Sequence, residues 1–176
     1  MQPHSIEAER SVLGGLLLAA DSWDAIVEIV DAADFYRPQH RMIFRQVAIL
    51  IDRGEPVDVV TVADRLLATG ELEAAGGHQY LSELAEHTPT AANIRAYAKA
   101  VRERAVLRQL IGAAQDIANT GFHPEGRPAE ALLDEAERRI MQISESGPKT
   151  GGPQSMPSLI QGALDRIEEL YNSGGD

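Results

Sequence analysis

The chain has 176 residues, a formal net charge of −11 and no cysteine. This length suffices for one ordinary domain with an appendage, and the core is expected to be aliphatic because aromatic residues make up only 5%. The lack of cysteine excludes disulfides, thiolate metal sites and a cysteine nucleophile, and it fits a cytoplasmic protein. The acidic balance argues against sequence-independent DNA binding, which needs a basic surface that displaces counterions.

The first predicted element is an amphipathic helix in "SIEAERSVLGGLLLAA", residues 5–20. Ser5 can cap it, and the glutamates of its first turn suit its positive end. Gly14 and Gly15 stand in its apolar half, where each costs about 1 kcal/mol relative to alanine. We expect them to permit close packing inside one monomer, and contact with a ligand is the alternative. The early acidic residues and the poor cleavage pattern argue against a secretory signal, and no segment approaches the roughly 20 apolar residues of a membrane span.

Four more short helices are predicted to complete a compact all-α head over residues 1–87. Their ranges are 22–30, 37–54, 57–70 and 78–86. The first of them has Asp21 or Ser22 as its cap, and the second ends at Gly54. The third begins with valines that also suit a strand, but a cap at Asp58 or Thr61 favours a helix.

A helical hairpin is predicted over residues 88–144. Residues 90–120 lack proline and predict a long helix, and residues 129–144 predict a returning one. The long helix has more apolar surface than one neighbouring helix can cover, so we expect a second copy of the chain to pack there. The predicted dimer interface consists of Ile94, Tyr97, Val101 and Leu110. The residues expected to point inward from the returning helix are Leu132, Leu133, Ala136, Ile140 and Ile143.

A linker rich in glycine, proline and serine is predicted over residues 145–157, followed by an amphipathic helix over 158–172. Ser158 and Gln161 form a capping-box pair at the start of that helix. A lone helix of this length is not stable in water, so it must dock on another domain or chain. The docking residues are Ile160, Leu164, Ile167, Leu170 and Tyr171.

No pattern in the sequence indicates a catalytic, cofactor-binding or metal site. The stretch "GPKTGG" around Lys149 departs from the phosphate-loop pattern, which requires glycine directly before the lysine. No two histidines have the i, i+4 spacing of helical metal ligands, and no serine lies in a nucleophile elbow. We therefore expect no catalysis by this chain. A small-molecule-binding all-α regulatory domain and an enzyme with a scattered site remain as alternatives.

Several stretches, in order, resemble bacterial replicative DNA helicases of the DnaB type. They are "IEAERSVLGGLLL", "DFYRPQHRMIF", "GGHQYLSEL", "TPTAANIRAYAKAVRERAVLRQLI", "GRPAEALLDEAE" and "RIEELY". The resemblance covers essentially the whole chain and implies an amino-terminal domain with its linker helix. The family's RecA-like ATPase domain would begin beyond residue 176.

The resemblance implies the collar of a hexameric helicase that moves 5′ to 3′ on one DNA strand and uses ATP and magnesium. Hairpins would pair to give a trimer of dimers, and the helix over 158–172 would dock on a neighbouring motor domain. Other implied partners are primase and the helicase loader, while single-stranded DNA would bind mainly through the absent domain. Ile111 and Ile117 match positions implicated in primase communication, and a place in the hairpin core is their alternative.

Overall fold

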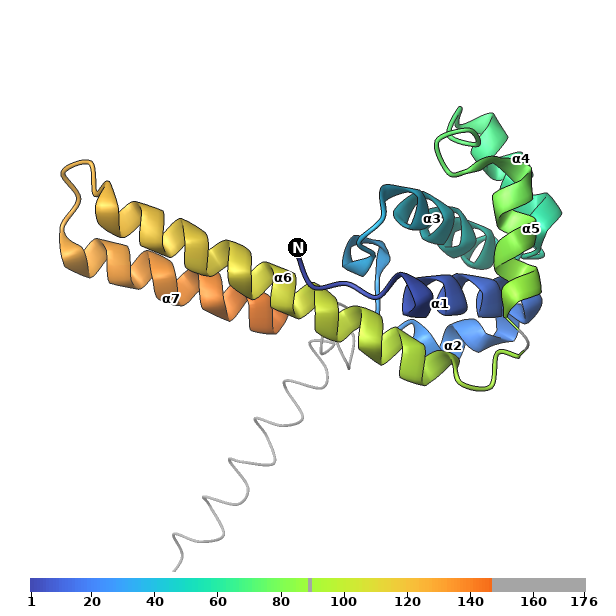
Figure 1. Cartoon of the computed structure of the whole chain (residues 1–176), viewed down its shortest axis with the longest axis horizontal. Coiled ribbons are helices and arrows are strands. Elements are labelled where there is room, and N and C mark those ends of the chain that lie inside the picture. Colours follow the sequence, from blue (N-terminus) through green and yellow to red (C-terminus); the bar gives the residue numbers. More distant parts are fainter. Residues whose placement is uncertain (89, 147–176) are drawn as a thin grey trace, which may run out of the picture.

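The computed structural model describes residues 1–88 and 90–146, which are entirely helical apart from their connections (Figure 1). The α-helices are α1 (Ile6–Leu18), α2 (Trp23–Ile26), α3 (Pro38–Asp52), α4 (Val59–Ala68), α5 (Gly77–His87), α6 (Ile94–Phe122) and α7 (Ala129–Glu145). No helix in these ranges combines the length and the apolar character that a membrane crossing requires. The expected docking helix over 158–172 lies outside the described residues, whereas Glu145, expected in the linker, ends α7.

The head is built around α1, which packs against α3, α5 and α6. Its largest fully buried apolar side chains come from five helices and one connection, namely Leu13, Leu16, Ile26, Phe35, Ile43, Leu50, Leu66, Leu81 and Leu84. Val101 of α6 belongs to the same core. Aliphatic residues dominate this core, as the composition predicts. The prediction of an all-α head with five short helices is confirmed by α1 to α5.

Several helix ends follow the signals in the sequence. The Ser5 side chain accepts a hydrogen bond from the Ala8 amide at the start of α1. Asp58 and Thr61 form a reciprocal capping box, which decides in favour of a helix in the valine-rich segment. The predicted helix 22–30 is shorter than expected, because α2 spans only four residues and Ser22 makes no side-chain capping bond.

The two glycines of α1 lie where other helices cross it closely. A Cβ atom on Gly14 would overlap the hydroxyl of Thr88 and the carbonyl oxygen of Leu84, both at the end of α5. A Cβ atom on Gly15 would come within 3.0 Å of Cδ1 of Ile94, the first residue of α6. The glycines therefore allow close packing inside one chain, as expected.

Helix α6 belongs to both parts of the molecule. Its first half packs on the head, and its second half extends away from the head beside α7 (Figure 1). Ile94 and Val101 are only 4% and 1% exposed and lie in the core of the head. The expectation that a second chain covers these two residues is wrong, because the chain's own head covers the first half of the stripe. Tyr97 is partly buried against the same core, and Leu110 is exposed.

Two apolar residues of helix α7 are more exposed than the sequence predicts. Leu132, Ala136 and Ile143 are partly buried, but Leu133 and Ile140 remain 63% and 49% exposed. The expectation that both of these residues point inward is therefore wrong. The physical reason is that the hairpin is only two helices thick, so α6 alone cannot cover the whole apolar face of α7.

Candidate interaction surfaces of the helical hairpin

A chain of polar contacts in the head links three helices, with Glu9 and His40 buried and Tyr80 partly exposed. The Glu9 carboxylate accepts hydrogen bonds from the amides of Tyr36 (2.9 Å) and Arg37 (3.3 Å) and contacts Nδ1 of His40 at 2.8 Å. Nε2 of His40 lies 2.6 Å from the Tyr80 hydroxyl. Burial raises the pKa of Glu9, but these hydrogen bonds together outweigh burial and hold that pKa below its ordinary value. Since His40 is fully buried, the chain of contacts has a structural role.

Two arginines of α6 hold the junction between head and hairpin. Nη1 of Arg102 lies 2.6 Å from Asp34 Oδ1. Arg108 donates to the carbonyl oxygens of Pro3 (2.8 Å) and Asp34 (2.7 Å), and its guanidinium lies 5.4 Å from the centre of the Tyr36 ring. Burial raises the pKa of Asp34 in spite of Arg102. Sequence reasoning missed these roles, because a charged residue on a helix gives no sign of which distant backbone it will reach.

The second half of α6 carries one exposed apolar surface. We call it the α6 surface and define it by Leu107, Leu110 and Ile111, which are all exposed. They follow one another at i, i+3 and i+4, so they lie on one face of the helix. Two of the predicted site residues, Leu110 and Ile111, are thus brought together on this surface.

A second apolar feature lies between α6 and α7 near the hairpin tip. This tip groove has a volume of about 400 Å³ and is lined mainly by apolar side chains. Its apolar lining includes Ile117, Leu132, Leu133 and Ala136. Ile117 is half-buried here and does not join the α6 surface, so the two residues expected to communicate with primase lie in different environments.

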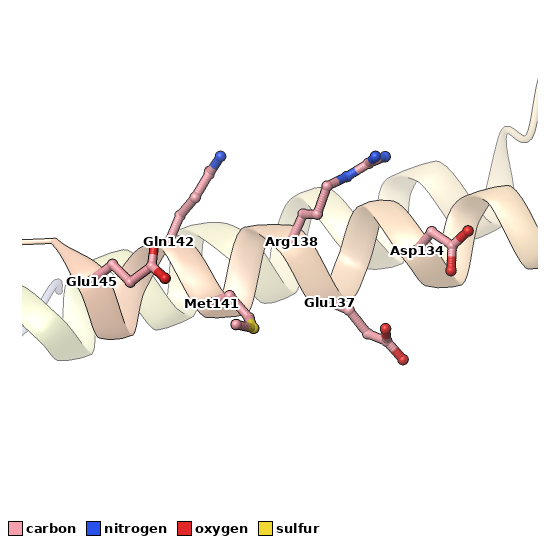
Figure 2. Close-up of a pocket in the computed structure, with 6 residues that line it drawn as sticks. All are labelled: Asp134, Glu137, Arg138, Met141, Gln142 and Glu145. Carbon is pink, nitrogen blue, oxygen red and sulfur yellow. The ribbon is translucent and has the colours of Figure 1, made fainter. Parts of the chain in front are cut away.

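The outer side of α7 forms a third, more polar feature, shown in Figure 2. It is an open hollow of about 550 Å³ lined by Asp134, Glu137, Arg138, Met141, Gln142 and Glu145. Arg138 and Gln142 project to one side of the helix, whereas Glu137 and Met141 project to the other (Figure 2). Because the polar groups diverge, this hollow suits a broad protein surface better than a small ligand.

These features together define an all-helical domain with a packed head and an exposed hairpin. Across residues 1–88 and 90–146, no group of histidines and carboxylates is arranged to hold a metal ion. Residues 1–103 match the family model described as "DnaB-like helicase N terminal domain", and the chain belongs to that family.

Individual relatives agree with this assignment. The chain is 40% identical over 172 residues to the replicative DNA helicase DnaB of Buchnera aphidicola, with 97% of this chain covered but only 37% of the relative. A crystal structure of the N-terminal domain of DnaB helicase from Mycobacterium tuberculosis matches 81% of this chain and 99% of its own length, with 39% identity and a TM-score of 0.78.

A more distant solved structure shares the fold. It is a DnaB-like replicative helicase described together with its interactions with primase, with 23% identity and a TM-score of 0.66 over 98% of this chain and 38% of that one. The alternative of a small-molecule-binding regulatory domain gains no support from these comparisons.

Proposed function

We propose that this chain is the collar domain of a hexameric, ATP-dependent replicative DNA helicase, where it self-associates through the hairpin and docks primase. The observation that carries the proposal is the exposed apolar side of the hairpin in a chain that belongs to the DnaB-like N-terminal family. Apolar side chains clustered on a protruding element favour burial against another protein.

Self-association is supported by exposed apolar residues on the second half of α6 and on α7. Leu110 is 47% exposed on the α6 surface, and Leu133 and Ile140 are exposed on α7. Two copies that bring these residues together remove apolar area from water, at about 25 cal/mol for each Å². Leu110 remains a proposed interface residue, together with the half-buried Tyr97, whereas Ile94 and Val101 act within the head.

Primase docking is supported by two residues and by one relative. Ile111 lies on the α6 surface, and Ile117 lines the tip groove. A DnaB-like helicase of the same fold is described with its interactions with primase. A primase segment that seats an apolar side chain on either feature would use the residues that the family resemblance indicates.

The remaining parts of the proposal concern the longer relatives. The chain spans about 37% of the length of the first curated relative. We propose that ATP, magnesium and most single-stranded DNA contacts belong to residues outside it. We further propose that a neighbouring motor domain receives the segment over 158–172, that a helicase loader acts on the assembly, and that the protein works in the cytoplasm.

The experiment that tests the proposal measures the mass of the chain in solution with and without the helicase-binding fragment of the cognate primase. We expect a concentration-dependent mass above that of a monomer and a further increase with the fragment. Ile111→Glu should abolish the second increase, whereas Val60→Glu, at an exposed position of α4 in the head, should not. A monomer at all concentrations, or equal primase binding by both variants, would contradict the proposal.

A further inference from the structure

The structure contains a three-way connection at Arg102, in the middle of α6. Nη1 of this arginine pairs with Asp34 of the head at 2.6 Å, and Nη2 donates to the backbone carbonyl and the hydroxyl of Ser146, which follows the last residue of α7. Asp34 and Ser146 are 112 positions apart in sequence and make no direct bond to each other among the described contacts. Arg102 therefore joins the head to the end of the hairpin.

The connection also brings a cation to the end of α7. The last carbonyl groups of a helix lack partners within the helix and carry a partial negative charge, which a cation in the last turn usually compensates. Helix α7 has no basic residue in its last turn. Arg102 supplies that cation from another helix, and the Ser146 hydroxyl contacts Gln109 at 2.9 Å.

Asp34, at the head end of the connection, is also held in place by hydrogen bonds. Oδ2 of Asp34 accepts a hydrogen bond from the Asp31 amide at 3.0 Å, so the carboxylate is fixed before Arg102 reaches it. The Asp34 carbonyl oxygen accepts from Arg108, which also holds Pro3 of the N-terminal arm. The Asp34 side chain is 2% exposed, so this end of the ion pair is screened little by solvent.

From these contacts we infer that Arg102 is a positioning residue: it fixes the position of Ser146 at the end of α7, which we call the exit point, relative to the head. A planar guanidinium has donors that point in two directions, so it can hold Asp34 and Ser146 at the same time. A movement of Asp34 or of the N-terminal arm at Pro3 would therefore also move Ser146 at the exit point. This inference does not depend on the proposed function.

The test uses spin labels, because the chain has no native cysteine. Exposed positions Ala68 in α4 and Glu145 in α7 are changed to cysteine and labelled, and the distribution of distances between them is measured by pulsed electron resonance. A second labelled pair, at Ala68 and Ala118, reports on the direction of α6 itself. We expect Arg102→Gln to broaden the distribution for the pair ending at Glu145 and to leave the pair ending at Ala118 unchanged.

Two further variants separate positioning from simple charge pairing. Arg102→Lys keeps a positive charge near Asp34 but has a single ammonium group, so we expect the same broadening as with glutamine. Arg104→Gln is the matched control, since Arg104 lies on the same helix and pairs with its neighbour Glu103 at 3.7 Å. The amides of residues 141–146 should exchange hydrogen about tenfold faster in both Arg102 variants, as expected for loss of a charged hydrogen bond.

Three outcomes would overturn the inference. An unchanged distribution in Arg102→Gln would mean that packing on α6 alone holds the end of α7. A narrow distribution in Arg102→Lys would mean that charge, and not the two-sided bridge, is what matters. Equal broadening for both labelled pairs would mean that Arg102 holds the head together and does not place the exit point.

Discussion

Glu9 of α1 and His40 of α3 lie in contact at 2.8 Å, with side chains that are 2% and 0% exposed. They are 31 positions apart in sequence, and Tyr80 of α5 extends the contact to a third helix. A carboxylate can be buried this deeply only when hydrogen bonds replace its water, and Glu9 has three such partners within residues 36–40. The pair therefore reports on whether α1, α3 and α5 are correctly assembled.

The first prediction concerns the pH dependence of stability. Hydrogen bonds hold the pKa of Glu9 in the folded chain below its ordinary value of 4.5 despite burial, which acts in the opposite direction. Its contribution is therefore complete above pH 4.5 and is lost as the pH falls through the lower folded pKa. Glu9→Gln should lower the free energy of unfolding by about 1–3 kcal/mol at pH 7 and by less in acid. Urea unfolding at several pH values measures this difference.

The comparison with the wild-type chain is necessary because Asp34 acts with the opposite sign. Burial raises the pKa of Asp34, so its charge costs stability near neutrality and that cost disappears in acid. Asp34 is present in both proteins and cancels from their difference. An equal loss of stability for Glu9→Gln at pH 7 and in acid would contradict the assignment to Glu9.

The second prediction concerns three helical glycines with different surroundings. Gly14→Ala should destabilise the fold by roughly 1–3 kcal/mol, because the new Cβ atom meets the Leu84 carbonyl and Thr88. Gly15→Ala meets only the flexible end of Ile94 and should be milder. Gly112→Ala has open space around it and should stabilise α6 by about 0.5–1 kcal/mol. Thermal unfolding of the three variants should give this order, and equal effects at Gly14 and Gly112 would refute the packing argument.

The third prediction separates the two halves of the α6 stripe. Val101→Glu should prevent folding of the head, since it places a charge in the core. Leu110→Glu should leave helicity intact and reduce the mass at micromolar concentration, because Leu110 lies on the exposed α6 surface. Circular dichroism and analytical ultracentrifugation distinguish these effects. A folded Val101→Glu variant with reduced mass would show that the first half of the stripe is an interface after all.

The fourth prediction concerns nucleic acid. Residues 1–87 contain 15 acidic and six basic residues, so the head carries a formal charge of −9. We expect the isolated chain to bind single-stranded DNA no more tightly than the nonspecific range of about 10⁻⁴ to 10⁻⁶ M at physiological salt. Fluorescence anisotropy with a labelled oligonucleotide measures this, and nanomolar affinity would rule the expectation out.

The sequence by itself determined the helices, several of their ends and the class of the fold. Ser5, Asp58 and Gly54 act through hydrogen bonds or backbone angles within a few residues, so their effects can be read locally. The paired glycines of α1 also indicated close packing, although not which helix would approach. The helical spacing of apolar residues identified α6 and its apolar stripe for the same reason, because this spacing can be read from neighbouring positions alone.

Only the tertiary structure decided what covers each apolar residue. The stripe of α6 looks continuous in sequence, yet the head covers Val101 and leaves Leu110 exposed. Three of the five α7 residues expected to point inward are partly buried and two are exposed, because one neighbouring helix cannot cover the whole apolar face. The contacts of Glu9 with His40 and of Arg102 with Asp34 and Ser146 join positions 31 to 68 residues apart. Such contacts depend on how whole elements are placed, and no local pattern encodes that placement.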